Sequence, residues 1–128
     1  MAHKSGLKIL LTPYVESRDY WEGEWVLDEN EWTAKVLKWA RFAEANSIEM
    51  FAPGVENNLI MDENIAGDWL KSILPQIREV YTGKVITAEH YDIDRWQALD
   101  KQNSFAGYDC IGLTVFPRKE YNGTSDIR

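Results

Sequence analysis

Two glutamates follow apolar runs at points where β-strands are expected to end. Glu56 comes after the run 48–52 and a Pro-Gly pair, and Glu89 comes directly after the run 84–88. A carboxyl group at a strand end can point into a cleft and act as a general acid or base, or bind a polar ligand. Each glutamate can equally be a solvated loop residue, and the residues alone leave both interpretations open.

The charge balance argues against two classes of partner. The formal net charge is -7 at pH 7, which disfavours binding to a phosphate backbone, so we expect no nucleic-acid partner. No apolar run approaches the length of about 20 residues that a membrane span needs, so we expect no membrane partner. The run 7–11 is too short for the core of a signal peptide, which favours a cytoplasmic location if residue 1 is the native N-terminus.

Metal-ligating residues are few. The chain has one cysteine, Cys110, and two histidines, His3 and His90. A single thiol cannot form an intramolecular disulfide, and three such residues spread along the chain do not make a metal cluster, so we expect no metal or other cofactor. Because Cys110 lies in an apolar run, we expect a buried thiol in the core.

The hydrophobic pattern predicts alternating strands and helices. Four short apolar runs have the character of buried parallel strands: 7–12, 48–52, 84–88 and 108–116. Three segments between them carry apolar residues at helical spacing: 32–43, 65–80 and 96–105. The order βαβαβαβ with short connections predicts an α/β fold with a parallel sheet. The longer polar loops all follow strands, which is the edge where such folds carry chemistry.

Local signals refine the helices. Asp28 or Asn30 is expected to cap the first helix, and Asp92 or Asp94 the third. Pro75 falls inside the second helix and should kink it or cost about 3 kcal/mol, but the apolar pattern continues on both sides. Four tryptophans lie on these helical faces and are expected in the core: Trp32, Trp39, Trp69 and Trp96.

Several short motifs then occur in a characteristic order. They are Trp21-Glu-Gly23, Trp32, Phe51-Ala-Pro-Gly-Val-Glu56, Trp69, Ile77-Arg78, Tyr81-Thr-Gly83-Lys-Val-Ile-Thr87 and Asp109-Cys-Ile-Gly112. Together they resemble glycoside hydrolase family 113, a family of retaining β-glycosidases whose characterised members are endo-β-1,4-mannanases. The similarity covers nearly the whole chain.

The resemblance implies half of a TIM (β/α)8 barrel. The four strands match barrel strands three to six, so residues 1–128 are expected to form a single half-barrel domain. The acid/base glutamate of the family stands at the end of strand four, and that position is Glu56, which we expect to face the same side as Glu89 and Tyr91. The nucleophile stands at the end of strand seven, which this chain does not contain. We therefore expect a glycoside hydrolase domain for a β-linked, mannan-type glycan that is inactive alone, or else a non-catalytic carbohydrate-binding or structural remnant.

The same resemblance suggests residues that contact an oligo- or polysaccharide. Sugars present flat C–H faces that stack on aromatic rings, which suits loop tryptophans at a cleft rim. The candidates are Trp21, Trp25, Asn57, Glu89, His90 and Tyr91. Each has an alternative, since a loop tryptophan can anchor its loop to the core and a polar residue can simply complete a turn.

A half-barrel should also leave surfaces uncovered. Four parallel strands have two open edges, and the former barrel interior loses its opposite wall. Some apolar strand residues must line that face; the candidates are Ile9, Leu11, Ile48, Met50, Val85, Ile111 and Leu113. At about 25 cal/mol per Å², exposing several of them forgoes several kcal/mol. We therefore expect a homodimer formed through the open barrel face.

Overall fold

The computed structural model describes residues 2–14, 29–57, 61 and 63–114. Their elements are, in order, the 3-10 helix η1 (Ala2–Ser5), β1 (Leu10–Leu11), α1 (Glu29–Ala45), β2 (Met50–Phe51), α3 (Glu63–Arg78), β3 (Lys84–His90), α4 (Ile93–Lys101) and β4 (Cys110–Thr114). The strands lie where the apolar runs predicted them, although β1 and β2 are only two residues long.

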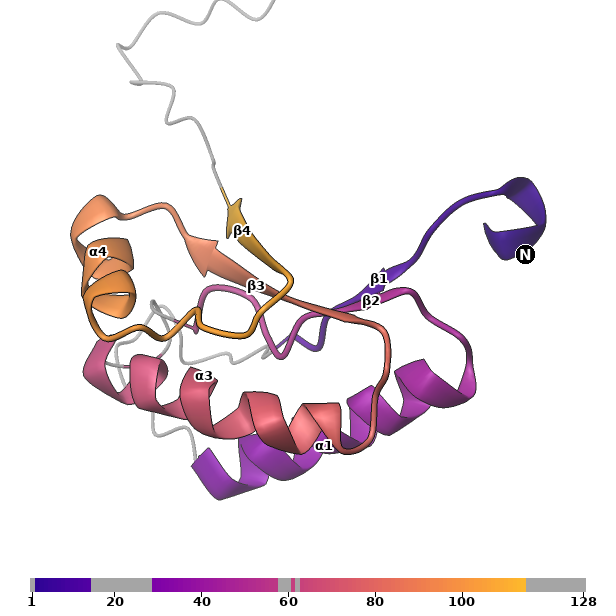
Figure 1. Ribbon diagram of the computed structural model, residues 1–128, viewed down its shortest axis with the longest axis horizontal. Coiled ribbons are helices and arrows are strands. Elements are labelled where there is room, and N and C mark those ends of the chain that lie inside the picture. The colour runs from indigo at the N-terminus through magenta and orange to yellow at the C-terminus, as the bar shows by residue number, and fades with distance from the viewer. Residues whose placement is uncertain (1, 15–28, 58–60, 62, 115–128) are drawn as a thin grey trace, which may run out of the picture.

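The four strands form one parallel sheet in the order β1-β2-β3-β4 (Figure 1). Leu10 pairs with Met50, Met50 with Lys84, and Ile86 with Cys110. Strand order therefore follows sequence order, and the predicted βαβαβαβ arrangement with a parallel sheet is confirmed.

Helices α1 and α3 lie side by side along one side of the sheet (Figure 1). The core forms between this helix layer and the sheet; its fully buried members include Val36, Ala40, Phe51, Leu70, Ile73, Ile77 and Val85. A hydrogen bond of 2.9 Å from the Trp69 indole N–H to the Thr33 hydroxyl joins the two helices. On β3, Val85, Thr87 and Glu89 are buried and alternate with less buried neighbours, so these three point toward the helix layer.

Local sequence explains where the helices lie. Asp92 is the N-cap of α4, and its carboxylate accepts from the Arg95 N–H at 3.2 Å. Helix α3 runs through Pro75, as its continuous apolar face predicted. Helix α1 ends before Ser47, which takes the left-handed conformation (φ 52°) that commonly terminates helices.

Two burial predictions were wrong. Trp39 was expected in the core but is 41% exposed, because it points away from the α1 face that packs on the sheet. Cys110 was expected to be a buried thiol but is exposed, because β4 lies at the edge of the described sheet, where β3 is its only partner among the described residues. Ile111 and Leu113 of the same strand are also about half exposed. Trp32 and Trp69 are buried as predicted, and Trp96 is half-buried.

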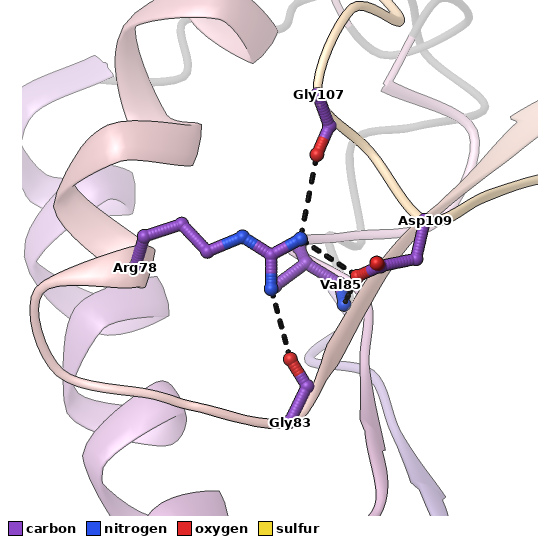
Figure 2. Close-up of polar contacts among 5 residues, drawn as sticks. All are labelled: Arg78, Gly83, Val85, Gly107 and Asp109. Atoms are coloured by element: carbon purple, nitrogen blue, oxygen red, sulfur yellow. Dashed lines mark hydrogen bonds and ion pairs between the residues drawn. The ribbon is translucent and has the colours of Figure 1, made fainter.

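A hydrogen-bonded network joins α3 to the beginnings of β3 and β4 (Figure 2). The Arg78 guanidinium donates to the carbonyl oxygens of Gly83 (2.9 Å) and Gly107 (3.3 Å) and to the Asp109 carboxylate (2.6 Å). The same Asp109 oxygen accepts from the Val85 N–H at 2.7 Å. This network lies at the edge where the strands begin, so Arg78, Gly83 and Asp109 stabilise the fold at the edge opposite to Glu56.

Candidate functional site

Glu56 lies at the edge where the strands end, five residues beyond the end of β2. Its backbone takes the left-handed conformation (φ 56°), which is uncommon for a residue other than glycine or asparagine. Its N–H donates to the carbonyl oxygen of Ala88 at 2.6 Å, so the chain returns to β3 after the turn at 53–55. That hydrogen bond fixes the position of Glu56 relative to the end of β3.

The Glu56 carboxylate accepts a short hydrogen bond from the hydroxyl of Thr114, the last described residue of β4. Thr114 pairs with His90 in the sheet, so their side chains share the face of the sheet that Ala88 also occupies. This is the face turned away from the helix layer. The carboxylate of Glu56 therefore lies on the side of the sheet that the described helices leave uncovered.

Asn57 and Glu89 meet on the other side of the sheet. The Asn57 amide donates to the Glu89 carboxylate at 2.9 Å, and both residues are 0% exposed. Glu89 thus points toward the helix layer, although we expected it to face the same side as Glu56. Burial, together with the carboxylate of Glu89, raises the pKa of the Tyr108 phenol well above its ordinary value.

Gly54 makes room for Asn57. A Cβ atom at residue 54 would lie 2.5 Å from the Asn57 side-chain oxygen, well inside van der Waals contact. The Pro-Gly pair after β2 therefore has a steric reason: the turn brings Asn57 under residue 54 while Glu56 is directed the other way.

His90 is the last residue of β3, and Tyr91 follows it beside this site. Their rings lie 4.7 Å apart with an interplanar angle of 37°, and both residues are partly exposed. The ring nitrogen Nδ1 of His90 accepts from the Asp92 N–H at 3.2 Å. Trp21 and Trp25, the other predicted contacts, lie outside the described residues. Among the residues that the structure describes, no three His, Cys, Asp or Glu side chains are grouped to hold a metal ion.

The model of Glycoside Hydrolase Family 113 matches residues 1–122. The chain belongs to this family. None of the curated proteins compared with the sequence matches it significantly. Within the described part of the chain, no helix combines the length and apolar character needed to cross a membrane.

Solved family 113 structures share the fold. A structure of a GH113 β-1,4-mannanase aligns with a TM-score of 0.59 at 24% identity, covering 76% of this chain and 36% of that one. A complex structure of a GH113 β-1,4-mannanase aligns with a TM-score of 0.58 at 25% identity, and the alignment covers 77% of this chain and 37% of that one. The GH113 β-mannanase AaManA from Alicyclobacillus acidocaldarius, solved in complex with ManMIm, aligns with a TM-score of 0.60 at 24% identity. This alignment covers 77% of this chain and 36% of that one. The chain spans little more than a third of the length of these relatives, and its four parallel strands, which alternate with helices, are a partial TIM barrel.

Sequence reasoning on this family 113 chain did not find Thr114. The residue lies 58 positions from Glu56 and within the apolar run 108–116, where a threonine is an ordinary strand residue. Its place opposite His90 depends on the register between β3 and β4. The hydrophobic pattern of the sequence does not determine that register to within one residue.

Proposed function

We propose that this chain forms the acid/base part of the substrate cleft of a glycoside hydrolase for β-linked, mannan-type glycans, with Glu56 as the general acid and base. The observation that carries the proposal is the carboxylate of Glu56, which lies at the edge where the strands end, on the face of the sheet that the described helices do not cover. Family membership supports the reaction class.

In this mechanism Glu56 first protonates the oxygen of the leaving sugar and then activates the water that releases the glycosyl group. The Thr114 hydroxyl, which donates to the carboxylate, orients it for both steps. His90 and Tyr91 are the proposed sugar contacts at the end of β3, and Trp21 and Trp25 are proposed contacts in the loop after β1. Asn57 and Glu89 are fully buried, so we propose that they position Glu56 and do not contact the sugar themselves.

Hydrolysis of β-mannan by the isolated chain should be weak or absent. A retaining mechanism needs a second carboxylate about 5–5.5 Å from the acid/base residue to attack the anomeric carbon. Glu89 points to the opposite side of the sheet from Glu56 and does not supply it. Turnover by the chain alone that disappears in Glu56→Gln would show that a nucleophile is present after all.

The acid role itself can be tested by supplying the missing strands. The chain is mixed with a polypeptide that contains the other barrel strands of a family 113 mannanase, and aryl β-mannooligosaccharides are assayed. In Glu56→Ala, turnover should fall by about 10²–10⁴-fold for a poor leaving group and far less for dinitrophenolate, which needs no protonation. Glu79→Ala, an exposed carboxylate at the end of α3, is the control. Equal losses with both leaving groups would exclude Glu56 as the acid.

A second candidate function is glycan binding without turnover. A hollow of about 290 Å³ beside the end of β1 is lined by Leu11, Thr12, Pro13, Tyr14, Trp32, Lys35 and Trp39. Tyr14 and Trp39 are both substantially exposed, and aromatic rings of this kind can stack on sugar faces. Titration calorimetry with mannooligosaccharides distinguishes the candidates: binding lost in Tyr14→Ala but kept in Glu56→Gln favours this hollow.

We also propose that the chain forms a homodimer through its open barrel face. Leu10, on the face away from the helices, is 42% exposed, and within the described part of the chain the outer strands β1 and β4 each have one edge without a partner strand. A two-fold pair of chains would cover these groups. Analytical ultracentrifugation at micromolar concentration tests this, and a stable monomer would refute it.

A further inference from the structure

Residues 56 and 57 are held to two consecutive residues of β3 on opposite sides of the sheet. The Glu56 N–H donates to Ala88, and the Asn57 amide donates to the Glu89 carboxylate. The backbone from the Glu56 nitrogen to the Asn57 Cα atom is therefore tethered to β3 at both ends. Thr114 completes the arrangement, because its hydroxyl donates to the Glu56 carboxylate and lies 3.4 Å from the Glu89 carbonyl oxygen.

Breaking the hydrogen bond between Asn57 and Glu89 costs free energy because both side chains are buried. Both side chains are completely buried, so losing the bond leaves a buried amide or carboxylate without that partner. A hydrogen bond to a carboxylate is also stronger than one between neutral groups. The left-handed backbone of Glu56, by contrast, is unfavourable for a residue with a Cβ atom and persists only where its surroundings impose it.

We propose that Asn57 and Glu89 form a positioning pair that holds Glu56 in its left-handed conformation and thereby directs its carboxylate toward Thr114. The pair acts through the backbone, because Asn57 is the next residue in the chain and its bond to Glu89 restrains the peptide that joins it to Glu56. A catalytic role for this pair rests on the proposed function of Glu56. The effect of the pair on the Glu56 backbone does not depend on that function.

The test exchanges the donor and acceptor of the pair and follows the Glu56 amide in the full chain. Asn57→Asp is nearly isosteric but removes the donor and opposes two carboxylates. Asn57→Asp with Glu89→Gln restores the bond in reverse, because the new glutamine amide can donate to the new aspartate. Native-state hydrogen exchange is measured by NMR at the Glu56 N–H, with the Asp109 N–H, which donates to Val85 at 2.8 Å, as the reference amide.

Asn57→Asp should accelerate exchange of the Glu56 N–H by about tenfold or more relative to the Asp109 N–H, and the double variant should restore it. An unchanged Glu56 rate, equal acceleration at both amides, or no recovery in the double variant would overturn the proposal. If Asn57→Asp does not fold, Asn57→Ala carries the same comparison. No glycan is needed, so failure of the proposed function would leave this result intact.

Discussion

One oxygen of the Asp109 carboxylate accepts two hydrogen bonds, from the Arg78 guanidinium at 2.6 Å and from the Val85 N–H at 2.7 Å. The contact joins the last residue of α3 to the beginnings of two neighbouring strands (Figure 2). It therefore fixes the edge of the sheet opposite to Glu56.

Arg78→Met should destabilise the fold by about 1–2 kcal/mol, because it removes one charge-assisted bond and two bonds to backbone carbonyls at a partly exposed site. Urea unfolding measures the change as a lower midpoint at an unchanged slope. Lys71→Met is the control: it breaks an exposed ion pair with Asp68 and should cost less than about 0.5 kcal/mol. Equal losses in the two variants would contradict the importance of the network.

Stability should fall on acidification partly through Asp109. The hydrogen bonds from Arg78 and from the Val85 N–H hold the pKa of this carboxyl below its ordinary value. A depressed folded-state pKa gives stabilisation that is complete above the unfolded-state pKa of about 3.9 and is lost as pH falls through the folded-state pKa.

Urea midpoints measured from neutral pH down to about pH 2.5 test this titration. Asp109→Asn should be less stable than the parent at neutral pH, and the difference should shrink at acid pH. Parallel curves for the two proteins would show that Asp109 does not contribute to the acid transition.

Ser47→Gly should stabilise the protein by about 1 kcal/mol. Ser47 is exposed and has a φ of 52°, where a Cβ atom is unfavourable and glycine is not. Calorimetry should show a melting temperature higher by about 4 °C. Ser47→Ala keeps the Cβ atom and should bring no such gain, so a rise in both variants would point to another cause.

Gly112→Ala should loosen the contact between β3 and β4. A Cβ atom at residue 112 would lie 2.6 Å from the carbonyl oxygen of Thr87, so the strands must separate, at about 1–3 kcal/mol. Urea unfolding gives the loss of stability, and faster amide exchange along β4 would locate it. Cys110→Ser, an exposed change on the same strand, should stay within about 0.5 kcal/mol.

Much of the fold could be predicted because its elements have strong local patterns. The apolar runs located all four strands, and the helical spacing through Pro75 correctly outweighed the proline, since the apolar face of α3 packs on both sides of it. Asp92 was among the expected caps because its side chain can bind the first free N–H groups of a helix.

The failures share a physical cause. Burial at Trp39 and Cys110 was inferred as if each element were covered on all sides, but these residues lie at the margin of the sheet and helix layers. The site was located only to the strand ends. Whether Glu56 and Glu89 share a face depends on the positive φ of Glu56, and neither Glu nor its neighbours signal that conformation.

Because strand order equals sequence order, each of β2, β3 and β4 finds a partner in the strand that precedes it. As the polypeptide leaves the ribosome, β2 can join β1, β3 can join β2 and β4 can join β3, without waiting for a distant segment to be synthesised. The hydroxyl of Thr114 reaches the carboxylate of Glu56 only when β4 is added. Growth of this sheet and formation of the Glu56–Thr114 contact are thus one continuous process along the chain.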